Sequence, residues 1–195
     1  MRTLPPLAAI RERLASRPAQ RVPADEKLRR AAVSAILRDN DGILEMLFIR
    51  RAERATDPWS GHMAFPGGRF DPRDPDLEAT AVRETMEEVG VDLRRDAELL
   101  GGIDDVPAIA RGRHMGLVVS PFVWLLRNPV TLSPNHEVHE ALWAAIEPLY
   151  RGERRTTIEY PWEGEVLTLP GIDVDGRVVW GLTLQMLKGL FELLA

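Results

Sequence analysis

Hydrophobic and polar positions follow two periods along this 195-residue chain, and each period predicts one kind of secondary structure. Residues 77–89 repeat apolar side chains at helical spacing and give the strongest helix pattern in the chain. Two apolar runs, 31–38 and 43–50, flank the polar segment 39–42, which is typical of a β-hairpin. We expect further strands at residues 63–65, 99–103, 117–126, 137–143 and 177–180, and further helices at residues 6–16, 146–150 and 182–194.

The predicted strands mix with a few helices, without the regular strand–helix alternation of a parallel sheet. That order predicts the α+β class with a mixed sheet. The length allows one sizeable core, so we expect an N-terminal helix and connector over residues 1–30 and a single domain over residues 31–195. The segment 151–170 is polar and rich in turn-forming residues, and we expect it to be irregular.

The amino-acid composition indicates which binding partners and which cellular location to expect. The chain carries 25 basic and 30 acidic side chains, which gives a formal charge of −5, so no nucleic-acid partner is expected. No apolar run approaches the ~20 residues of a membrane span, and we recognise no secretory signal at the beginning of the sequence. The sequence contains no cysteine, which excludes disulfides and thiol chemistry and fits a cytoplasmic location.

The predicted helix over residues 77–89 separates its apolar side chains from a row of carboxylates. Glu84, Glu87 and Glu88 lie opposite the apolar face, at relative positions i, i+3 and i+4. Like charges at this spacing cost roughly 0.2–0.5 kcal/mol per pair in an isolated helix. A hard divalent cation such as Mg²⁺ or Mn²⁺ would relieve the repulsion and also bind substrate phosphates. The row therefore indicates metal-assisted attack of water on a phosphoanhydride.

The alternative is a solvated acidic helix face, which is common in soluble proteins. The flanking sequence favours the catalytic interpretation. Gly67 and Gly68 permit a tight backbone turn shortly before the helix. Asp74 and Pro75 match a helix cap followed by proline at the first helical position. Gly90 supplies the left-handed residue that commonly ends a helix.

Residues 83–91 resemble the signature of the Nudix hydrolase family, which runs Arg-Glu-aliphatic-any-Glu-Glu-any-Gly-aliphatic. Two features depart from that pattern. Thr85 stands where the family has an aliphatic residue, and the spacing from Gly68 to the signature is one residue longer. The first acidic position of the family pattern then falls at Asp74 or at Asp76.

The resemblance implies a Nudix-type α/β/α sandwich with a central mixed sheet. It also implies that Glu84, Glu87 and Glu88 bind Mg²⁺ or Mn²⁺, that the backbone carbonyl of Gly68 adds a ligand, and that one glutamate serves as base. Arg83 would orient these carboxylates; the alternative role for Arg83 is an ordinary i,i+4 pair with Glu87.

The likeness extends to the coenzyme A pyrophosphatase branch of this family. It is carried by the segments 47–52, 65–68 and 180–183, together with Asp71-Pro72. The branch implies hydrolysis of coenzyme A or an acyl-CoA to phosphopantetheine, or its acyl form, and adenosine 3′,5′-bisphosphate. Other open substrates are ADP-ribose, NDP-sugars and nucleoside triphosphates, and a non-catalytic nucleotide sensor is the alternative of another class. The candidate substrate-binding residues are Arg51, Arg54, Phe65, Gly67, Gly68, Arg69, Arg111 and Arg113.

The expected partner is a small nucleotide-derived molecule, and the protein could form a homodimer. The sequence supports a role in the site less strongly for several other side chains. His62 is expected to be a solvated loop residue, and Glu137 is a loop carboxylate that leads into a strand. Trp59 and Trp162 are candidates to stack on an adenine, whereas Trp180 is expected to pack against the core. The turn-rich segment offers Glu159 and Glu163 as further candidate bases.

Overall fold

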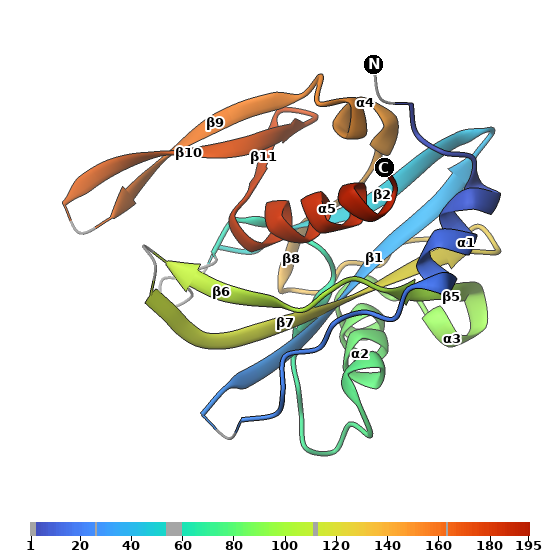
Figure 1. The fold of residues 1–195 in the computed structure, drawn as a ribbon, viewed down its shortest axis with the longest axis horizontal. Helices are drawn as coiled ribbons and strands as arrows, with labels where there is room; N and C mark the ends of the chain where they lie inside the picture. The colour runs from blue at the N-terminus through green and yellow to red at the C-terminus, as the bar shows by residue number, and fades with distance from the viewer. Residues whose placement is uncertain (1–2, 26, 54–59, 111–112, 163) are drawn as a thin grey trace.

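A computed structural model describes residues 3–25, 27–53, 60–110, 113–162 and 164–195, with backbone alone for Ala110, Arg113 and Trp162. Figure 1 shows a central sheet with helices on both faces and a second, smaller sheet beside it. The described helices are α1 (Leu7–Ser16), α2 (Leu77–Val89), α3 (Leu93–Asp96), α4 (Ile146–Arg151) and α5 (Gly181–Leu193). The strands of the central sheet are β1 (Arg29–Asn40), β2 (Ile43–Arg51), β3 (Met63–Ala64), β4 (Gly67–Arg69), β5 (Ala97–Gly102), β6 (Val106–Ala110), β7 (Arg113–Leu126) and β8 (Val138–Ala145). The second sheet contains β9 (Arg155–Trp162), β10 (Glu165–Val174) and β11 (Arg177–Trp180).

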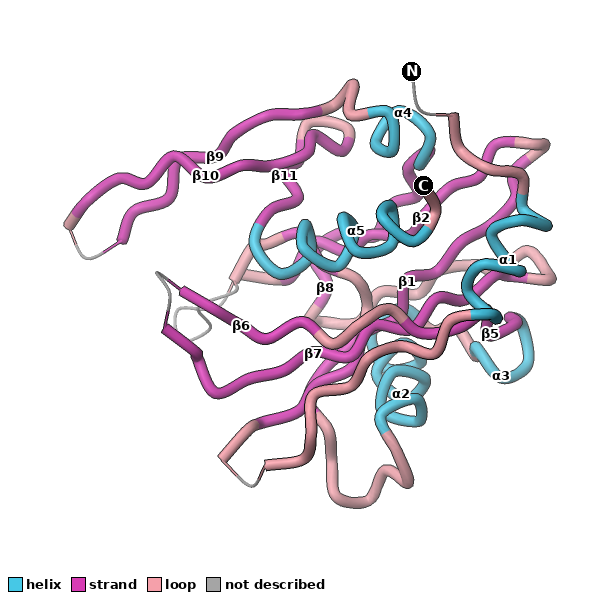
Figure 2. The backbone as a smooth tube through the Cα atoms, in the orientation of Figure 1, coloured by secondary structure: helices cyan, strands magenta, loops and turns pink. Residues whose placement is uncertain are grey.

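The central sheet is mixed, as the order of the predicted elements indicates. Its main path runs β3-β2-β1-β7-β5, with β4 paired to β1, β6 to β7 and β8 to β2. Strands β1 and β7 are parallel, whereas the other pairings in this sheet are antiparallel. Figure 2 shows the helices grouped on the two sides of these strands. The predicted α/β/α sandwich with a mixed sheet is therefore confirmed.

The sheet separates two hydrophobic cores. One core packs the sheet against α1, α4 and α5 and includes Ile10 and Leu14 of α1, which are 0% and 3% exposed. The other core packs the opposite face against α2 and α3 through Val82, Val89 and Leu93. Among the described helices, none is long and apolar enough to cross a membrane.

Salt bridges fix the segment between α1 and β1 to the loop between β5 and β6. Arg17 donates two hydrogen bonds to Asp104, at 2.9 and 2.7 Å. Asp105 is buried and accepts hydrogen bonds from Arg21 at 2.8 Å and from Arg30 at 2.9 Å. The sequence predicts an N-terminal helix and connector over residues 1–30, and these salt bridges tie the connector to the loop that follows β5.

The helix α2 has the predicted bounds, but a different residue caps it. The side chain of Asp76, rather than that of Asp74, accepts the backbone N–H of Ala79 at 2.7 Å. The prediction of an Asp74 cap is wrong because the chain turns once more, through Pro75, before the helix begins. Gly90 ends the helix with φ of 72°, a left-handed value that favours glycine.

The prediction that residues 151–170 are irregular is wrong. After α4 the chain forms an antiparallel hairpin of β9 and β10, in which Tyr160 lies opposite Leu167 and Ile158 opposite Leu169. These four side chains are half-buried and alternate with exposed residues, which is the pattern of a strand with one covered face. Pro161 and Pro170 interrupt the apolar pattern in the sequence and obscure this alternation. Strand β6 and the short helix α3 were also missed.

Candidate active site

The loop before α2 is held against the helix by the pairing of β4 with β1. In this pairing Ala32 lies opposite Gly68, and Val33 lies opposite Gly67. A Cβ atom at Gly67 would approach the carbonyl oxygen of Ala32 to 2.3 Å, and φ at Gly67 is 153°. A Cβ atom at Gly68 would lie 2.4 to 2.6 Å from the carboxyl atoms of Glu84. The glycine pair therefore brings backbone into direct contact with a helix carboxylate.

Glu88 is the most buried of the three glutamates. Its side chain is 2% exposed and accepts the backbone N–H of Gly67 at 2.8 Å. The guanidinium of Arg51 lies 3.8 Å away. Burial raises the pKa of Glu88 to about 7, the contacts with Gly67 and Arg51 oppose the rise, and the charges of Glu84 and Glu137 add to it. The contacts with Gly67 and Arg51 therefore offset only part of the effect of burial on the Glu88 carboxylate.

Glu84 and Glu87 are drawn toward a single arginine on the same helix. The side chain of Glu84 is 16% exposed and that of Glu87 is 55% exposed. Arg83 contacts Glu84 at 2.9 Å and Glu87 at 3.3 Å. Burial raises the pKa of Glu84, Arg83 opposes the shift, and the charges of Glu87 and Glu137 reinforce it.

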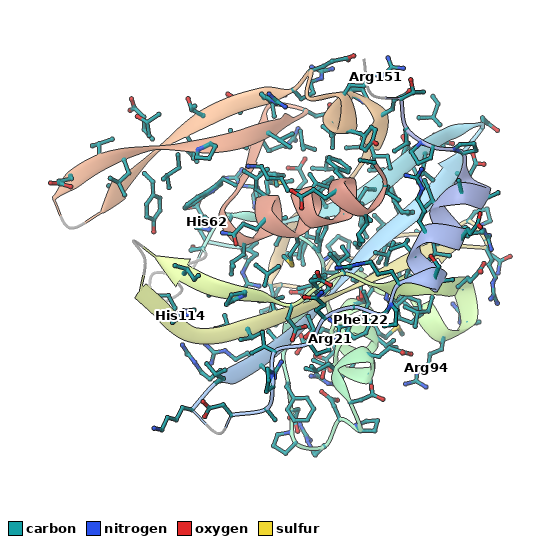
Figure 3. The ribbon with its side chains drawn as sticks, in the orientation of Figure 1. Arg21, His62, Arg94, His114, Phe122 and Arg151 are labelled. Atoms are coloured by element: carbon teal, nitrogen blue, oxygen red, sulfur yellow. The ribbon has the colours of Figure 1, made fainter. Side chains whose placement is uncertain are left out.

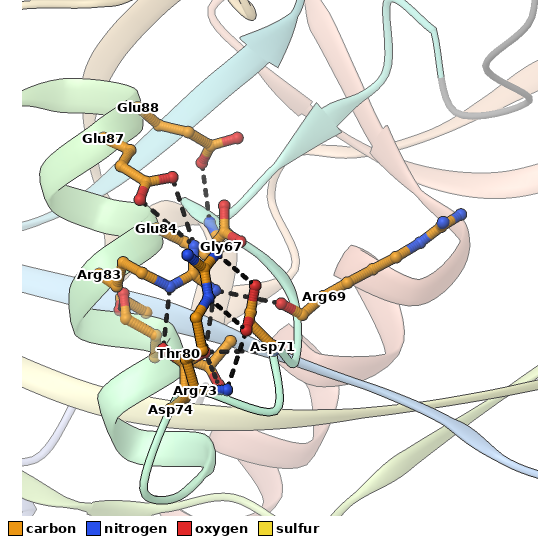
Figure 4. Close-up of polar contacts among 12 residues, drawn as sticks. Gly67, Arg69, Asp71, Arg73, Asp74, Thr80, Arg83, Glu84, Glu87 and Glu88 are labelled. Carbon is orange, nitrogen blue, oxygen red and sulfur yellow. Dashed lines mark hydrogen bonds and ion pairs between the residues drawn. The ribbon is translucent and has the colours of Figure 1, made fainter.

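Arg83 holds the site together through several contacts at once, as the close-up in Figure 4 shows. Its guanidinium makes two hydrogen bonds of 2.9 Å to Asp74 and a longer one of 3.3 Å to the carbonyl of Arg69. The hydrogen bonds from Arg83 lower the pKa of Asp74 to about 2, and Thr80 adds a hydrogen bond of 2.9 Å. Arg83 contacts Asp74 and Glu84 at shorter distances than Glu87. Its role is therefore more than that of an ordinary i,i+4 pair with Glu87.

The two acidic candidates before the helix have separate positions. Asp74 binds Arg83, whereas Asp76 caps α2. Asp74 therefore lies at the end of a chain of contacts that runs through Arg83 to the carboxylates, and Asp76 fixes the start of the helix that carries them.

A further carboxylate approaches this cluster from the strand β8. Glu137 lies just before β8, and its carbonyl accepts the backbone N–H of Ala52 at 2.7 Å. Its charge raises the pKa of both Glu84 and Glu88, so it faces the same region of the site. The sequence predicts Glu137 only as a loop carboxylate with a weak claim to the site, and the pairing of β2 with β8 is what brings it toward the helix glutamates.

The donor set fits a hard divalent cation. It consists of carboxylate oxygens, with the backbone of Gly68 directly against the carboxylate of Glu84. In the part of the chain that the structure describes, no three acidic or histidine side chains already surround one common point. Glu84 and Glu87 share the guanidinium of Arg83, whereas Glu88 accepts the N–H of Gly67.

The predicted substrate-binding residues are placed as follows. Arg51 points toward Glu88, and the exposed side chain of Arg69 extends away from Arg83 (Figure 4). Phe65 is 1% exposed and its ring stacks on Phe48 at a centroid distance of 5.4 Å, so its side chain supports the loop from within the core. The arginines at positions 54 and 111 lie outside the described residues, as does the side chain of the arginine at position 113.

Among the other predicted aromatic and acidic residues, His62 differs from expectation. His62 is half-buried beside Tyr160 and Trp180, so the expectation of a solvated loop residue is wrong. Trp180 is also half-buried and lies in the same group of rings. Glu159 is exposed on the opposite face of β9 from Tyr160. Trp59 and Glu163, like the side chain of Trp162, are not among the described residues.

The NUDIX domain family matches residues 28–162 of the chain. The chain is 39% identical over 117 residues to an uncharacterized protein of Schizosaccharomyces pombe, a match covering 58% of this chain and 36% of the yeast protein, so it spans well under half of that relative. It is 31% identical over 199 residues to the mitochondrial coenzyme A diphosphatase NUDT8 of Homo sapiens, covering 97% of this chain and 75% of that protein.

The NUDIX domain of NrtR from Shewanella oneidensis, solved in complex with ADP ribose, shows the likeness of fold. It has a TM-score of 0.57 at 18% identity, with 88% of this chain and 94% of that chain covered. The family match covers more than half of the chain and contains β1, the glycine loop and α2 with its three glutamates. The chain therefore belongs to the Nudix domain family.

Proposed function

We propose that the protein hydrolyses a diphosphate bond in a nucleoside diphosphate derivative, with Mg²⁺ or Mn²⁺ as cofactor. The observation that supports this most directly is the arrangement of α2 against the glycine loop. Glu84 and Glu88 are partly or fully buried there, one against Gly68 and the other on the N–H of Gly67. Buried carboxylates of the same charge are costly unless a cation or hydrogen-bond donors compensate them.

Nudix hydrolases generally use divalent metal ions. In this chain Glu84, Glu87, Glu88 and the carbonyl of Gly68 are the residues that would hold one. A bound ion of this kind activates water at neutral pH and neutralises charge on the leaving phosphate. The role of Arg83 is to orient these carboxylates, since it contacts both Glu84 and Glu87 while Asp74 holds it in place. The general base is one of the helix glutamates or Glu137.

We propose coenzyme A or an acyl-CoA as the substrate. The sequence segments shared with the coenzyme A pyrophosphatase branch support this choice, and so does the similarity to human NUDT8, which is named as a coenzyme A diphosphatase. The products would be phosphopantetheine, or its acyl form, and adenosine 3′,5′-bisphosphate. ADP-ribose, NDP-sugars and nucleoside triphosphates are the competing substrates of the same reaction. Three intact glutamates argue against a domain that only senses nucleotides.

The test is a hydrolysis panel of coenzyme A, acetyl-CoA, ADP-ribose and a dinucleoside polyphosphate, with products identified by mass. We expect turnover with Mg²⁺ or Mn²⁺, none with a chelator, and the highest kcat/KM for the coenzyme A compounds. Glu88→Gln should lower kcat by several orders of magnitude. The loss of a general acid or base alone typically costs about 10²- to 10⁴-fold. Glu159→Gln, on the exposed face of β9, is the matched control and should retain activity. Full turnover in Glu88→Gln would contradict the proposal.

A further inference from the structure

Three aromatic rings from separate parts of the chain meet beside the β9–β10 hairpin. His62 precedes β3, Tyr160 lies in β9 and Trp180 ends β11. The ring centroids of His62 and Trp180 are 4.5 Å apart, and those of Tyr160 and Trp180 are 4.7 Å apart. Figure 3 shows His62 close to the point where β11 runs into α5. We call His62, Tyr160 and Trp180 the aromatic trio.

The aromatic trio differs from the ring pairs of the core. Tyr150 and Phe191 stack edge to face at 5.3 Å and are 6% and 7% exposed, so their contact is part of the core. The three rings of the trio are all half-buried, so each keeps part of its surface accessible. Partly exposed rings can offer a surface on which a planar group stacks.

The scaffold fixes the trio before any ligand arrives. The buried hydroxyl of Thr183 donates to the carbonyl of Met63 at 3.0 Å, which ties the start of α5 to the residue after His62. The carbonyl of His62 accepts the backbone N–H of Arg51 at 3.0 Å. A surface held from two sides loses little conformational entropy when it binds, and this favours affinity.

A short path of contacts connects the trio to the catalytic carboxylates. Arg51 bonds to His62 through its backbone, and its guanidinium lies 3.8 Å from Glu88. Gly67 follows His62 by five positions, so their Cα atoms are at most about 18 Å apart. A nucleotide has its base and its diphosphate at opposite sides of the ribose, so two groups of residues joined by this short path are candidate partners for its two ends.

We propose that the aromatic trio binds the purine base of the nucleotide substrate by stacking. The inference rests on the proposed function, because it takes the substrate to be a coenzyme A compound, whose base is adenine. Histidine, tyrosine and tryptophan are the side chains on which bases stack in nucleic-acid complexes, and stacking needs no positive charge from this acidic chain. The pantetheine arm of a coenzyme A substrate would then bind elsewhere.

The experiment separates the two halves of the substrate. Calorimetry measures the binding of adenosine 3′,5′-bisphosphate and of 4′-phosphopantetheine, each alone with Mg²⁺, to the full chain and its variants. Tyr160→Leu removes a ring while keeping apolar bulk, and Tyr160→Phe keeps the ring. Ile158→Ala is the matched control, because Ile158 is half-buried on the same face of β9 and carries no ring.

Tyr160→Leu should weaken binding of adenosine 3′,5′-bisphosphate roughly 5- to 100-fold, the range of one lost base stack. Binding of 4′-phosphopantetheine should not change, and both Tyr160→Phe and Ile158→Ala should bind the bisphosphate like the unmodified protein. The inference is overturned if the unmodified protein does not bind the bisphosphate. It is also overturned if Tyr160→Leu has no effect, if Ile158→Ala weakens binding equally, or if the loss falls on 4′-phosphopantetheine. No bond is broken in this binding measurement, so its result can be interpreted whether or not the hydrolysis panel shows turnover.

Discussion

At the scale of single residues, the departure of Thr85 from the family pattern has a structural explanation. Thr85 is fully buried on α2, where an aliphatic residue would need no partner. Its hydroxyl donates to Ser34 at 2.8 Å, and the hydroxyl of Ser34 donates to the carbonyl of Ala81 at 3.3 Å. Ser34 is also fully buried, so the two polar side chains satisfy each other inside the core.

This pair predicts non-additive changes in stability. Thr85→Val keeps the shape of the side chain but removes the donor, and Ser34→Ala leaves the hydroxyl of Thr85 without its acceptor. Each single variant should lower the free energy of unfolding by about 1–2 kcal/mol, because a buried polar group loses its partner. The double variant should cost less than the sum, with a coupling of about 1 kcal/mol. Denaturant unfolding of the four proteins measures this, and strict additivity would show that the bond contributes nothing.

At the scale of elements, the helix α2 and its glycine loop were predictable because their patterns are local. The spacing of apolar residues and the glycines at positions 67, 68 and 90 indicated the helix, its entry and its end. The hairpin of β9 and β10 was not predictable in this way, because prolines mask its alternation and Tyr160 packs against His62 and Trp180, which are distant in sequence. Glu137 joins the site for a similar reason, since β2 must first pair with β8.

The glycine loop makes a prediction that distinguishes its two residues. A Cβ atom at Gly67 would collide with the backbone of Ala32, in a conformation that side chains rarely adopt. A Cβ atom at Gly68 would collide only with the end of the Glu84 side chain, which can move. Gly67→Ala should therefore lower the free energy of unfolding by at least about 3 kcal/mol, the scale of overpacking combined with backbone strain.

Gly68→Ala should fold with almost the same midpoint of thermal unfolding and should lose catalytic activity. The displaced carboxylate of Glu84 would no longer meet the loop, and such misplacement costs on the order of 10²-fold in kcat. Thermal unfolding and hydrolysis assays on both variants check this pair of expectations. Equal destabilisation of the two variants would mean that Glu84 is held more rigidly than its exposed fraction of 16% indicates.

At the scale of the whole molecule, the segment before β1 is joined to the fold through two neighbouring aspartates of very different exposure. The side chain of Asp105 is 1% exposed and accepts hydrogen bonds from Arg21, Arg30 and Ser120. The side chain of Asp104 is 39% exposed and pairs with Arg17. Removing one partner of a buried ion pair typically costs 3–5 kcal/mol, whereas exposed pairs contribute at most about 1 kcal/mol.

Asp105→Ala should accordingly lower the free energy of unfolding by about 3 kcal/mol, while Asp104→Ala should lower it by less than about 1 kcal/mol. Two charged guanidinium groups would lose their buried carboxylate in the first variant, but only one exposed arginine loses a partner in the second. If the N-terminal segment is part of the cooperative unit, the large loss in Asp105→Ala will appear in one unfolding transition that includes the segment, as followed by hydrogen exchange of residues 17–25. An unchanged global stability with rapid exchange confined to that segment would instead show that residues 17–25 unfold separately from the rest of the domain.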